Sequence, residues 1–328
     1  MLASMPLWDL LAGLSVRIDD LSVQRRELPR DKWTRVTTTV VLHGDGARGE
    51  GEDVTYEAEA HDEFPADAML AGTWSLDDLS RRLEELQLSD FRRWSFESAA
   101  LDLGLRQRGA SLGELIGRRY RQVRFVVSTR THIVPYLELN PALEFKLDAR
   151  QDWDRPLMRK LAAYDRVRVL DLKAYYRGTS VDLAPDPQLY RAVVEEFPDA
   201  VIEDASLDDG CREALNGAEA RLSFDAPVHS LADLDALPLQ PRWLNVKPSR
   251  FGTVRKLVEC IEACEERGIR MYGGGQFELG PGRRQIQRLA SLFYAAGPND
   301  VAPSEYNEGG ARPGLTTSPL LAPEGIGF

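Results

Sequence analysis

The sequence of 328 residues has few cysteines, which are Cys211, Cys260 and Cys264. An odd and sparse set of this kind does not form a disulfide framework. Cys260 and Cys264 share a helical face, but they have no further Cys or His neighbours with the spacing of a zinc site. We therefore expect buried free thiols in a protein of the reducing cytoplasm.

Long apolar runs and basic clusters are also missing. No stretch approaches the roughly 18 apolar residues that a membrane span needs. Met1 to Leu14 is apolar, but Asp9 interrupts it and no basic region precedes it, so it does not predict a secretion signal. The net charge is −11, and no run of five or six basic residues occurs. These features argue against binding to nucleic acid or to an acidic membrane and favour a freely soluble protein.

The first part of the chain mixes strand and helix patterns. Two β-rich segments, 14–23 and 33–43, predict a hairpin around a charged, mobile loop at 24–32. A third strand is expected at 47–54, where Gly49 and Gly51 are spaced as if another backbone passes close by. Helices are expected after the N-cap Ser75, over 91–108 and over 111–116. The sequence thus predicts an α+β capping domain over residues 1–120.

Strands and helices then alternate. Strand patterns occur at 123–127, 143–147, 167–171, 200–203, 222–225, 243–247, 269–272 and 300–302. Helices are expected between them at 154–164, 187–197, 231–237, 253–267 and 285–295. Eight such units predict a (β/α)₈-type barrel over residues 121–308 rather than an open sheet. The tail, 309–328, is rich in Gly and Pro and is expected to pack back on the capping domain.

Four consecutive strand patterns end on a charged residue. These residues are Asp171, Glu203 (followed by Asp204), Asp225 and Lys247, at steps of 32, 22 and 22 residues. Each step fits a strand with its crossover helix, and the carboxyl ends of barrel strands meet on one face. Each pair of carboxylates about 4 Å apart would cost about 4 kcal/mol, which a divalent cation relieves. Oxygen ligands favour Mg²⁺ first and Mn²⁺ second.

A structural interpretation of the same residues stays open. Strand-end acids can cap the next helix or pair with nearby arginines such as Arg166, Arg168 and Arg221. Lys247 can likewise form a structural ion pair with Asp225. An ordered set of three acids and one lysine nevertheless indicates a metal site more strongly than any isolated acid does.

The order of these features resembles the enolase superfamily, in the branch of mandelate racemase and muconate lactonizing enzyme. The resemblance includes the helix Phe96-Glu-Ser-Ala-Ala-Leu-Asp-Leu103, the segment 111–117 and a barrel with Lys146 on strand two. It covers about residues 14–308 and implies a modified TIM barrel with an N-terminal α+β cap. It further implies that Asp171, Glu203 and Asp225 bind Mg²⁺. A base, Lys247, would then take a proton α to a substrate carboxylate, through a metal-stabilised enediolate.

Two positions depart from the family pattern. The family has Lys-x-Lys on strand two, where this chain has Lys146-Leu147-Asp148, and Lys173 replaces an Asn that follows strand three. Lys173 can occupy space that the lost lysine would have filled, so Lys146 and Lys173 are candidate catalytic residues, or else structural partners of the acids. Racemisation needs groups on both faces, whereas chemistry on one face is less affected. The alternative is a metal-binding protein without turnover.

Further candidates lie beyond the strand ends. By resemblance, Glu278 lies near the substrate, while Arg177, Ser249 and Arg250 could hold a substrate carboxylate or be structural. The glycines of 273–282 serve a tight turn or bind phosphate. By resemblance, the loops 24–32 and 53–64 close over the barrel mouth and select the substrate.

The sequence therefore predicts a cytoplasmic, Mg²⁺-dependent lyase or isomerase of the dehydratase, cycloisomerase or racemase type. Its expected partner is a small carboxylate-bearing substrate, and neither nucleic acid nor a membrane is expected. Assembly into a homo-oligomer is left open, and the sequence does not name the substrate.

Overall fold

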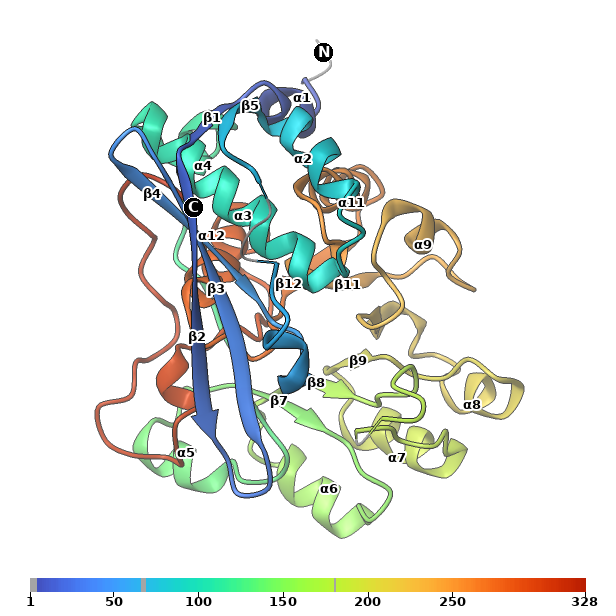
Figure 1. Ribbon diagram of the computed structural model, residues 1–328. Helices are drawn as coiled ribbons and strands as arrows, with labels where there is room; N and C mark the ends of the chain where they lie inside the picture. Colours follow the sequence, from blue (N-terminus) through green and yellow to red (C-terminus); the bar gives the residue numbers. More distant parts are fainter. Residues whose placement is uncertain (1–4, 66–68, 180) are drawn as a thin grey trace.

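The computed structural model describes residues 5–65, 69–179 and 181–328. An α+β cap (residues 15–116) is followed by a barrel of parallel strands with helices on its outside (Figure 1). The expected fold class is thereby confirmed.

The sheet of the cap is an antiparallel meander of β2 (Asp20–Pro29), β3 (Thr34–Gly44) and β4 (Ala47–Asp53). The long helix α3 (Asp90–Arg108) packs against β4. A Cβ atom on Gly49 would lie 2.2 Å from the carbonyl oxygen of Ala99, and one on Gly51 would lie 2.0 Å from that of Ser95. The predicted close approach of another backbone is therefore confirmed.

The predicted loop at 24–32 is wrong, because β2 continues to Pro29 and pairs with β3 along its whole length. β2 is an edge strand, so charged side chains can point into solvent without breaking the strand. The turn is confined to 30–33, where the N–H of Arg30 donates to the carbonyl of Trp33.

The helices of the cap begin and end where the sequence places their caps. The side chain of Ser75 accepts a hydrogen bond from the N–H of Asp78 at the start of α2 (Leu76–Glu84), and α3 ends at Gly109 with φ +69°. The short α4 (Leu112–Leu115) follows. Three elements were not predicted as such, namely α1 (Leu7–Ala12), the 3₁₀ turn Ala58–His61, and the pairing of β1 (Ser15–Ile18) with β5 (Gly72–Ser75).

The described residues of the barrel form seven parallel strands in sequence order. They are β6 (Val127–Thr129), β7 (Phe145–Asp148), β8 (Val167–Asp171), β9 (Val201–Glu203), β10 (Leu222–Phe224), β11 (Trp243–Val246) and β12 (Arg270–Gly273). Two parallel bridges, Phe125 with Asn299 and Gly274 with Asp300, link the edges of this sheet. The expected eighth strand at 300–302 is thus reduced to a seam of two bridging residues, because Pro303 follows at once.

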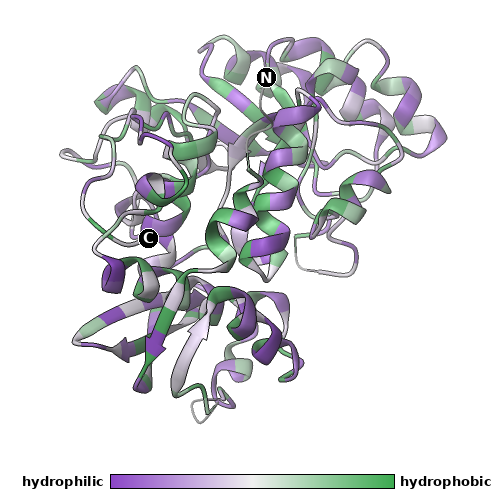
Figure 2. Ribbon diagram, turned by 90° about the horizontal axis from the view of Figure 1, so that it is seen from above, coloured by the Kyte–Doolittle hydropathy of each residue, from purple (hydrophilic) through white to green (hydrophobic). Residues whose placement is uncertain are grey.

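Helices cover the outside of the barrel (Figure 1). They are α5 (Val134–Leu139), α6 (Arg155–Ala162), α7 (Pro187–Glu196), α8 (Asp209–Ala214), α9 (Leu231–Asp235), α11 (Val254–Glu266) and α12 (Pro281–Phe293), with 3₁₀ turns at Glu219–Arg221 and Ser304–Tyr306. The short, buried α10 (Pro248–Phe251) packs instead against α3 of the cap. Figure 2 shows hydrophobic and hydrophilic residues interleaved along helices, as expected for helices with one buried face. The three cysteines are free and buried, as expected. None of the described helices is both long and apolar enough to cross a membrane.

The tail returns to the cap. Leu320 bridges Val123, Gly327 bridges Ser111, and the ring of Phe328 packs edge-on against Trp94 in α3. The N–H of Phe328 also donates to Asp102 Oδ1 at 2.7 Å. These contacts join the tail to α3, and the division of the chain at residue 120 stays a prediction.

Candidate metal and proton-transfer site

The predicted acids meet at one end of the barrel. Asp171 and Glu203 are the last residues of β8 and β9 and lie side by side in register, and Asp225 directly follows β10. All three side chains are fully buried. One carboxylate oxygen each of Asp171, Glu203 and Asp204 lie within 4.8 Å of one another, a group of which Asp225 is not a member.

Each of the three expected ligands has an ammonium partner. Lys146 Nζ lies 2.5 Å from Glu203 Oε1 and 3.3 Å from Asp171 Oδ2. Lys247 Nζ lies 2.7 Å from Asp225 Oδ2. The structure therefore brings the three acids and these two lysines to one rim of the barrel, which is the arrangement that both the catalytic and the structural interpretations require.

Lys173 lies beside Asp148, the residue that replaces the second lysine of strand two. Its Nζ is 3.2 Å from Asp148 Oδ1 and 2.6 Å from Asp171 Oδ2. Lys173 and Asp148 line a cavity of about 380 Å³ together with Arg130 and Arg150. The side chain of Lys173 is 17% exposed, whereas that of Lys146 is 3% exposed. Of these two lysines, Lys173 is the one that a molecule in this cavity could contact.

Burial and neighbouring charges set the ionisation of the acids. Burial, with the charges of Asp171 and Asp225, raises the pKa of Glu203 to about 7, although Lys146 opposes the shift. Burial alone would raise the pKa of Asp171, but Lys173 and Lys146 hold it well below its usual range. Asp225 behaves in the same way, since Arg250 and Lys247 outweigh burial and lower its pKa.

The two lysines at Asp171 are held as cations. Burial would lower the pKa of Lys146, but the charges of Glu203 and Asp171 raise it well above 10.5. The pKa of Lys173 is likewise raised, because Asp171 and Asp148 outweigh burial. The acid cluster therefore already attracts positive charge.

The donor set fits a divalent cation. Within the part of the chain that the structure describes, Asp225 Oδ1 and Asn245 Oδ1 are buried without a hydrogen-bond partner. Asn245 Nδ2 donates to Glu203 Oε1 at 3.2 Å. Converging carboxylate oxygens with such an unpaired acceptor suit a hard cation such as Mg²⁺ or Mn²⁺.

Arg250 and Tyr176 hold the other side of Asp225. Arg250 Nη2 lies 3.2 Å from Asp225 Oδ2 and donates to the hydroxyl of Tyr176 at 2.8 Å. That hydroxyl donates to the same oxygen of Asp225 at 2.9 Å. The amide of Gln276 bridges Arg250 and the cap residue Tyr56, at 3.2 Å from each. Sequence reasoning missed Tyr176 and Gln276, which lie in loops with no periodic pattern.

The remaining candidates are not gathered around the acids. Glu278 Oε1 accepts from the N–H of Gln276 at 2.6 Å, and Oε2 lies 3.3 Å from Arg283, so Glu278 binds its own loop. Ser249 is buried in α10, and Arg177 is exposed on the loop after β8. Their roles in substrate binding stay predictions.

The glycine-rich stretch holds a carboxylate of the cap. Glu52 accepts hydrogen bonds from the N–H groups of Leu279, Gly280 and Gly282 at 2.7, 2.9 and 2.9 Å, at the start of α12. Because the cap supplies this anion, these N–H groups are not free to bind a phosphate. The structure thus favours the structural role of these glycines.

Arg35 joins the two loops beside the barrel mouth. Its fully buried guanidinium donates to the carbonyls of Val54 (2.7 Å) and Thr55 (2.6 Å) in the cap loop, and of Gln276 (2.8 Å) and Phe277 (3.1 Å) after β12. Sequence reasoning missed Arg35 and Glu52, because their partners in the barrel are backbone groups more than 200 residues away along the chain.

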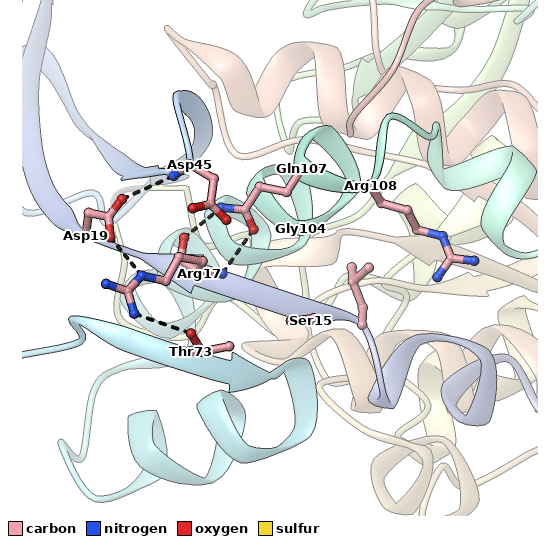
Figure 3. A pocket seen from close by; sticks show the side chains of 9 residues that line it. Ser15, Arg17, Asp19, Asp45, Thr73, Gly104, Gln107 and Arg108 are labelled. Carbon is pink, nitrogen blue, oxygen red and sulfur yellow. Dashed lines mark hydrogen bonds and ion pairs between the residues drawn. The ribbon is translucent and has the colours of Figure 1, made fainter.

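A larger cavity of about 640 Å³ lies elsewhere, in the cap between β1, β5 and the end of α3. Figure 3 shows Arg17, Asp19, Thr73 and Gln107 lining it and bonded to one another or to Asp45. None of the predicted site residues lines this cavity, so its size does not make it the reaction site.

Comparison with protein families decides the relationship of the chain. A family model described as "Domain of unknown function (DUF8230) C-terminal domain" matches residues 119–308, and its N-terminal counterpart matches residues 9–115. The chain belongs to the DUF8230 family. Among curated proteins, this DUF8230 chain is similar to an o-succinylbenzoate synthase of Geobacillus stearothermophilus, with 22% identity over 81% of the chain and 76% of the relative. An o-succinylbenzoate synthase of Enterococcus faecalis is 25% identical over 76% of this chain and 72% of the relative.

Solved structures share the fold of the DUF8230 chain. A member of the enolase superfamily from Enterococcus faecalis V583 has a TM-score of 0.70, with 20% identity over 88% of this chain and 87% of the other. Muconate cycloisomerase from Pseudomonas fluorescens has a TM-score of 0.68, with 19% identity over 88% and 87%. A dipeptide epimerase from Methylococcus capsulatus, complexed with a Mg ion, has a TM-score of 0.69, with 19% identity over 86% and 89%.

These relatives confirm the resemblance to the enolase superfamily and to its muconate lactonizing branch. The prediction of an enzyme of the lyase or isomerase type agrees with the names of the relatives.

Proposed function

We propose that this DUF8230 protein is a metal-dependent lyase or isomerase that abstracts a proton α to the carboxylate of a small molecule. The observation that carries the proposal is the convergence of Asp171, Glu203 and Asp225 with Lys247 on one rim of the barrel. The relatives support an enzyme and give no support to a metal-binding protein without turnover.

Asp171, Glu203 and Asp225 would hold the cation, with Mg²⁺ preferred and Mn²⁺ second. A bound divalent cation supplies Lewis-acid stabilisation of the negative charge that develops on the substrate carboxylate. The carboxylates contribute by binding and orienting, and their near-complete burial excludes water from the charges.

Lys247 takes the proton in this proposal. Its Nζ shares Asp225 Oδ2 with Arg250, so two cationic side chains compete for one carboxylate oxygen. This contact places Lys247 beside one of the acids that we expect to hold the cation. Lys146 would stay a cation that neutralises Glu203, and Lys173 would contact the substrate from the adjacent cavity.

The reaction that we favour takes place on one face of the substrate. Racemisation needs acid–base groups on both faces, and Asp148 stands where the family has its second lysine. Dehydration or cycloisomerisation through Lys247 alone therefore fits the residues better. The first compounds to test are those that the names of the relatives indicate, namely the substrate of o-succinylbenzoate synthases, muconate and dipeptides. Action in the cytoplasm and assembly into homo-oligomers stay predictions.

The decisive experiment follows α-proton exchange in D₂O with Mg²⁺ across a carboxylate library that includes these compounds. The wild-type chain is expected to exchange or convert at least one of them. K247A should lose exchange yet bind Mn²⁺ as before, while the matched variant K160A, at an exposed position of α6, should behave as wild type. Exchange by K247A at the wild-type rate would refute the role of Lys247. Metal binding without exchange of any compound would favour the non-enzyme.

A further inference from the structure

Asp204 ties the end of β9 to the end of β10. It follows Glu203 with a left-handed φ of +51°, and its side chain is fully buried. Oδ1 accepts a hydrogen bond from the N–H of Asp225 at 2.8 Å, and Oδ2 accepts one from the N–H of Ala226 at 3.0 Å. The backbone that carries Asp225 is therefore bound by both oxygens of a neighbouring acid.

The partners of this acid differ from those of its neighbours. An oxygen of Asp204 lies within 4.8 Å of oxygens of both Asp171 and Glu203. Asp171, Glu203 and Asp225 each have a lysine partner. Among the residues that the structure describes, no Lys, Arg or His side chain forms an ion pair with Asp204. Two backbone N–H groups are the partners of its carboxylate, in a place already rich in negative charge.

A tie between strand ends can use one acceptor oxygen or two. At the seam of the barrel Asn299 uses one, because its Oδ1 accepts from the N–H of Gly273 at 2.6 Å. Its Nδ2 donates to the carbonyls of Arg124 and Gly297. An amide at position 204 could accept only one N–H group through its oxygen, so the carboxylate of Asp204 is what allows both Asp225 and Ala226 to be held.

We infer that Asp204 is a positioning residue of the metal centre that sets its affinity for the divalent cation. It acts by holding the backbone of Asp225 in place through two N–H groups, so that the Asp225 carboxylate is positioned for the cation. Asp225 Oδ1, which is buried and unpaired among the described residues, is the oxygen that this tie keeps available. The inference rests on the proposed function, because it concerns the same cation.

The test is Mn²⁺ binding to the full chain, measured by calorimetric titration. D204N is expected to bind Mn²⁺ at least tenfold more weakly than wild type, and D171N should also be weakened. The matched control D209N, at an exposed position in the first turn of α8, should bind as wild type. Thermal unfolding of D204N in EDTA shows whether the variant is folded without metal. A structural role alone would lower the melting temperature of D204N in EDTA and leave its Mn²⁺ affinity unchanged.

The outcomes separate this inference from the proposed function. If wild type binds Mn²⁺ and D204N binds it equally well, the inference fails and the proposed function stands. If wild type binds no Mn²⁺, both fail. Should D204N not fold, a Mn²⁺-soaked crystal of the wild-type chain decides by anomalous scattering. We expect the cation on Asp225 Oδ1 with both hydrogen bonds of Asp204 intact, and a cation bound with those bonds broken overturns the inference.

Discussion

At the scale of single residues, one ammonium group serves two carboxylates. Lys173 Nζ contacts Asp171 and Asp148, so a lysine on the loop after β8 forms an ion pair with the acid at the end of β7. The sequence shows both departures from the family pattern separately, and the structure shows that they are partners. Asp148, which stands in place of a lysine, and Lys173, which stands in place of an asparagine, thus form an ion pair with each other.

Replacing Lys173 by Met should destabilise the protein without metal. In EDTA we expect a loss of about 1–3 kcal/mol in the free energy of unfolding, because two largely buried carboxylates lose their partner. With saturating Mg²⁺ the loss in free energy should be smaller, since the bound cation would neutralise the charge of Asp171. Urea unfolding in both buffers measures this. D148N is the control with a smaller expected effect, because Lys173 keeps Asp171, and an equal K173M loss in both buffers would contradict the prediction.

Residue patterns predicted which side chains share the rim, because strand ends in a parallel barrel must converge. They could not predict which ammonium binds which acid, because that depends on side-chain reach across neighbouring strands. Tyr176 and Gln276 were missed for a related reason. Their contacts to Asp225 and Arg250 follow from loop conformations, and no spacing in the sequence encodes these.

At the scale of elements, the cap depends on the close packing of β4 on α3. Gly49 and Gly51 let the strand backbone touch the helix backbone, which any side chain would prevent. This contact was predictable, because two glycines that are two residues apart in a strand often mark a place where another backbone comes close. The extension of β2 to Pro29 was not predictable, because an edge strand tolerates the charged pattern of a loop. The helix α12 begins at Pro281, earlier than expected at 285, because proline is favoured in the first turn.

Substituting Gly51 by Ala should therefore weaken the cap. The added Cβ would lie 2.0 Å from the carbonyl oxygen of Ser95, so strand and helix must separate. We expect a loss of about 1–3 kcal/mol in the free energy of unfolding, as for other overpacked sites. G13A is the control, since Gly13 has φ −84° and nothing within 4 Å of an added Cβ. Chemical unfolding monitored by circular dichroism tests this, and equal stability of G51A and G13A would refute it.

At the scale of the whole molecule, two buried charges join the cap to the barrel. Glu52 of β4 binds the start of α12, and Arg35 of β3 binds the carbonyls after β12. The sequence could not reveal this joint, because each side chain meets backbone groups that are distant along the chain. The order of elements was sufficient to predict a cap and a barrel, but not the groups that hold them together.

The joint gives the stability of the protein a pH dependence. Burial, followed by the charge of Glu278, raises the pKa of Glu52 above its ordinary 4.5. The folded state therefore holds this proton more tightly than the unfolded state does. The resulting stability is fully present below about pH 4.5 and is lost as the pH rises through the folded pKa.

We expect the unfolding free energy of wild type minus that of E52Q to fall as the pH rises from 4 to 8. Denaturant unfolding in EDTA at several pH values measures the difference. The exposed E59Q serves as the control, and its difference from wild type should not change with pH. A difference for E52Q that is equally independent of pH would contradict the prediction.

The contact of the tail with α3 has a consequence for protein synthesis. Trp94 and Asp102 of α3 receive their partner, Phe328, from the far end of the sequence. While a ribosome is still making the barrel, α3 can pack on β4 but lacks this cover. The packing of α3 is then incomplete until residue 328 has left the exit tunnel. We therefore expect the cap to reach its final stability only after the tail has been made.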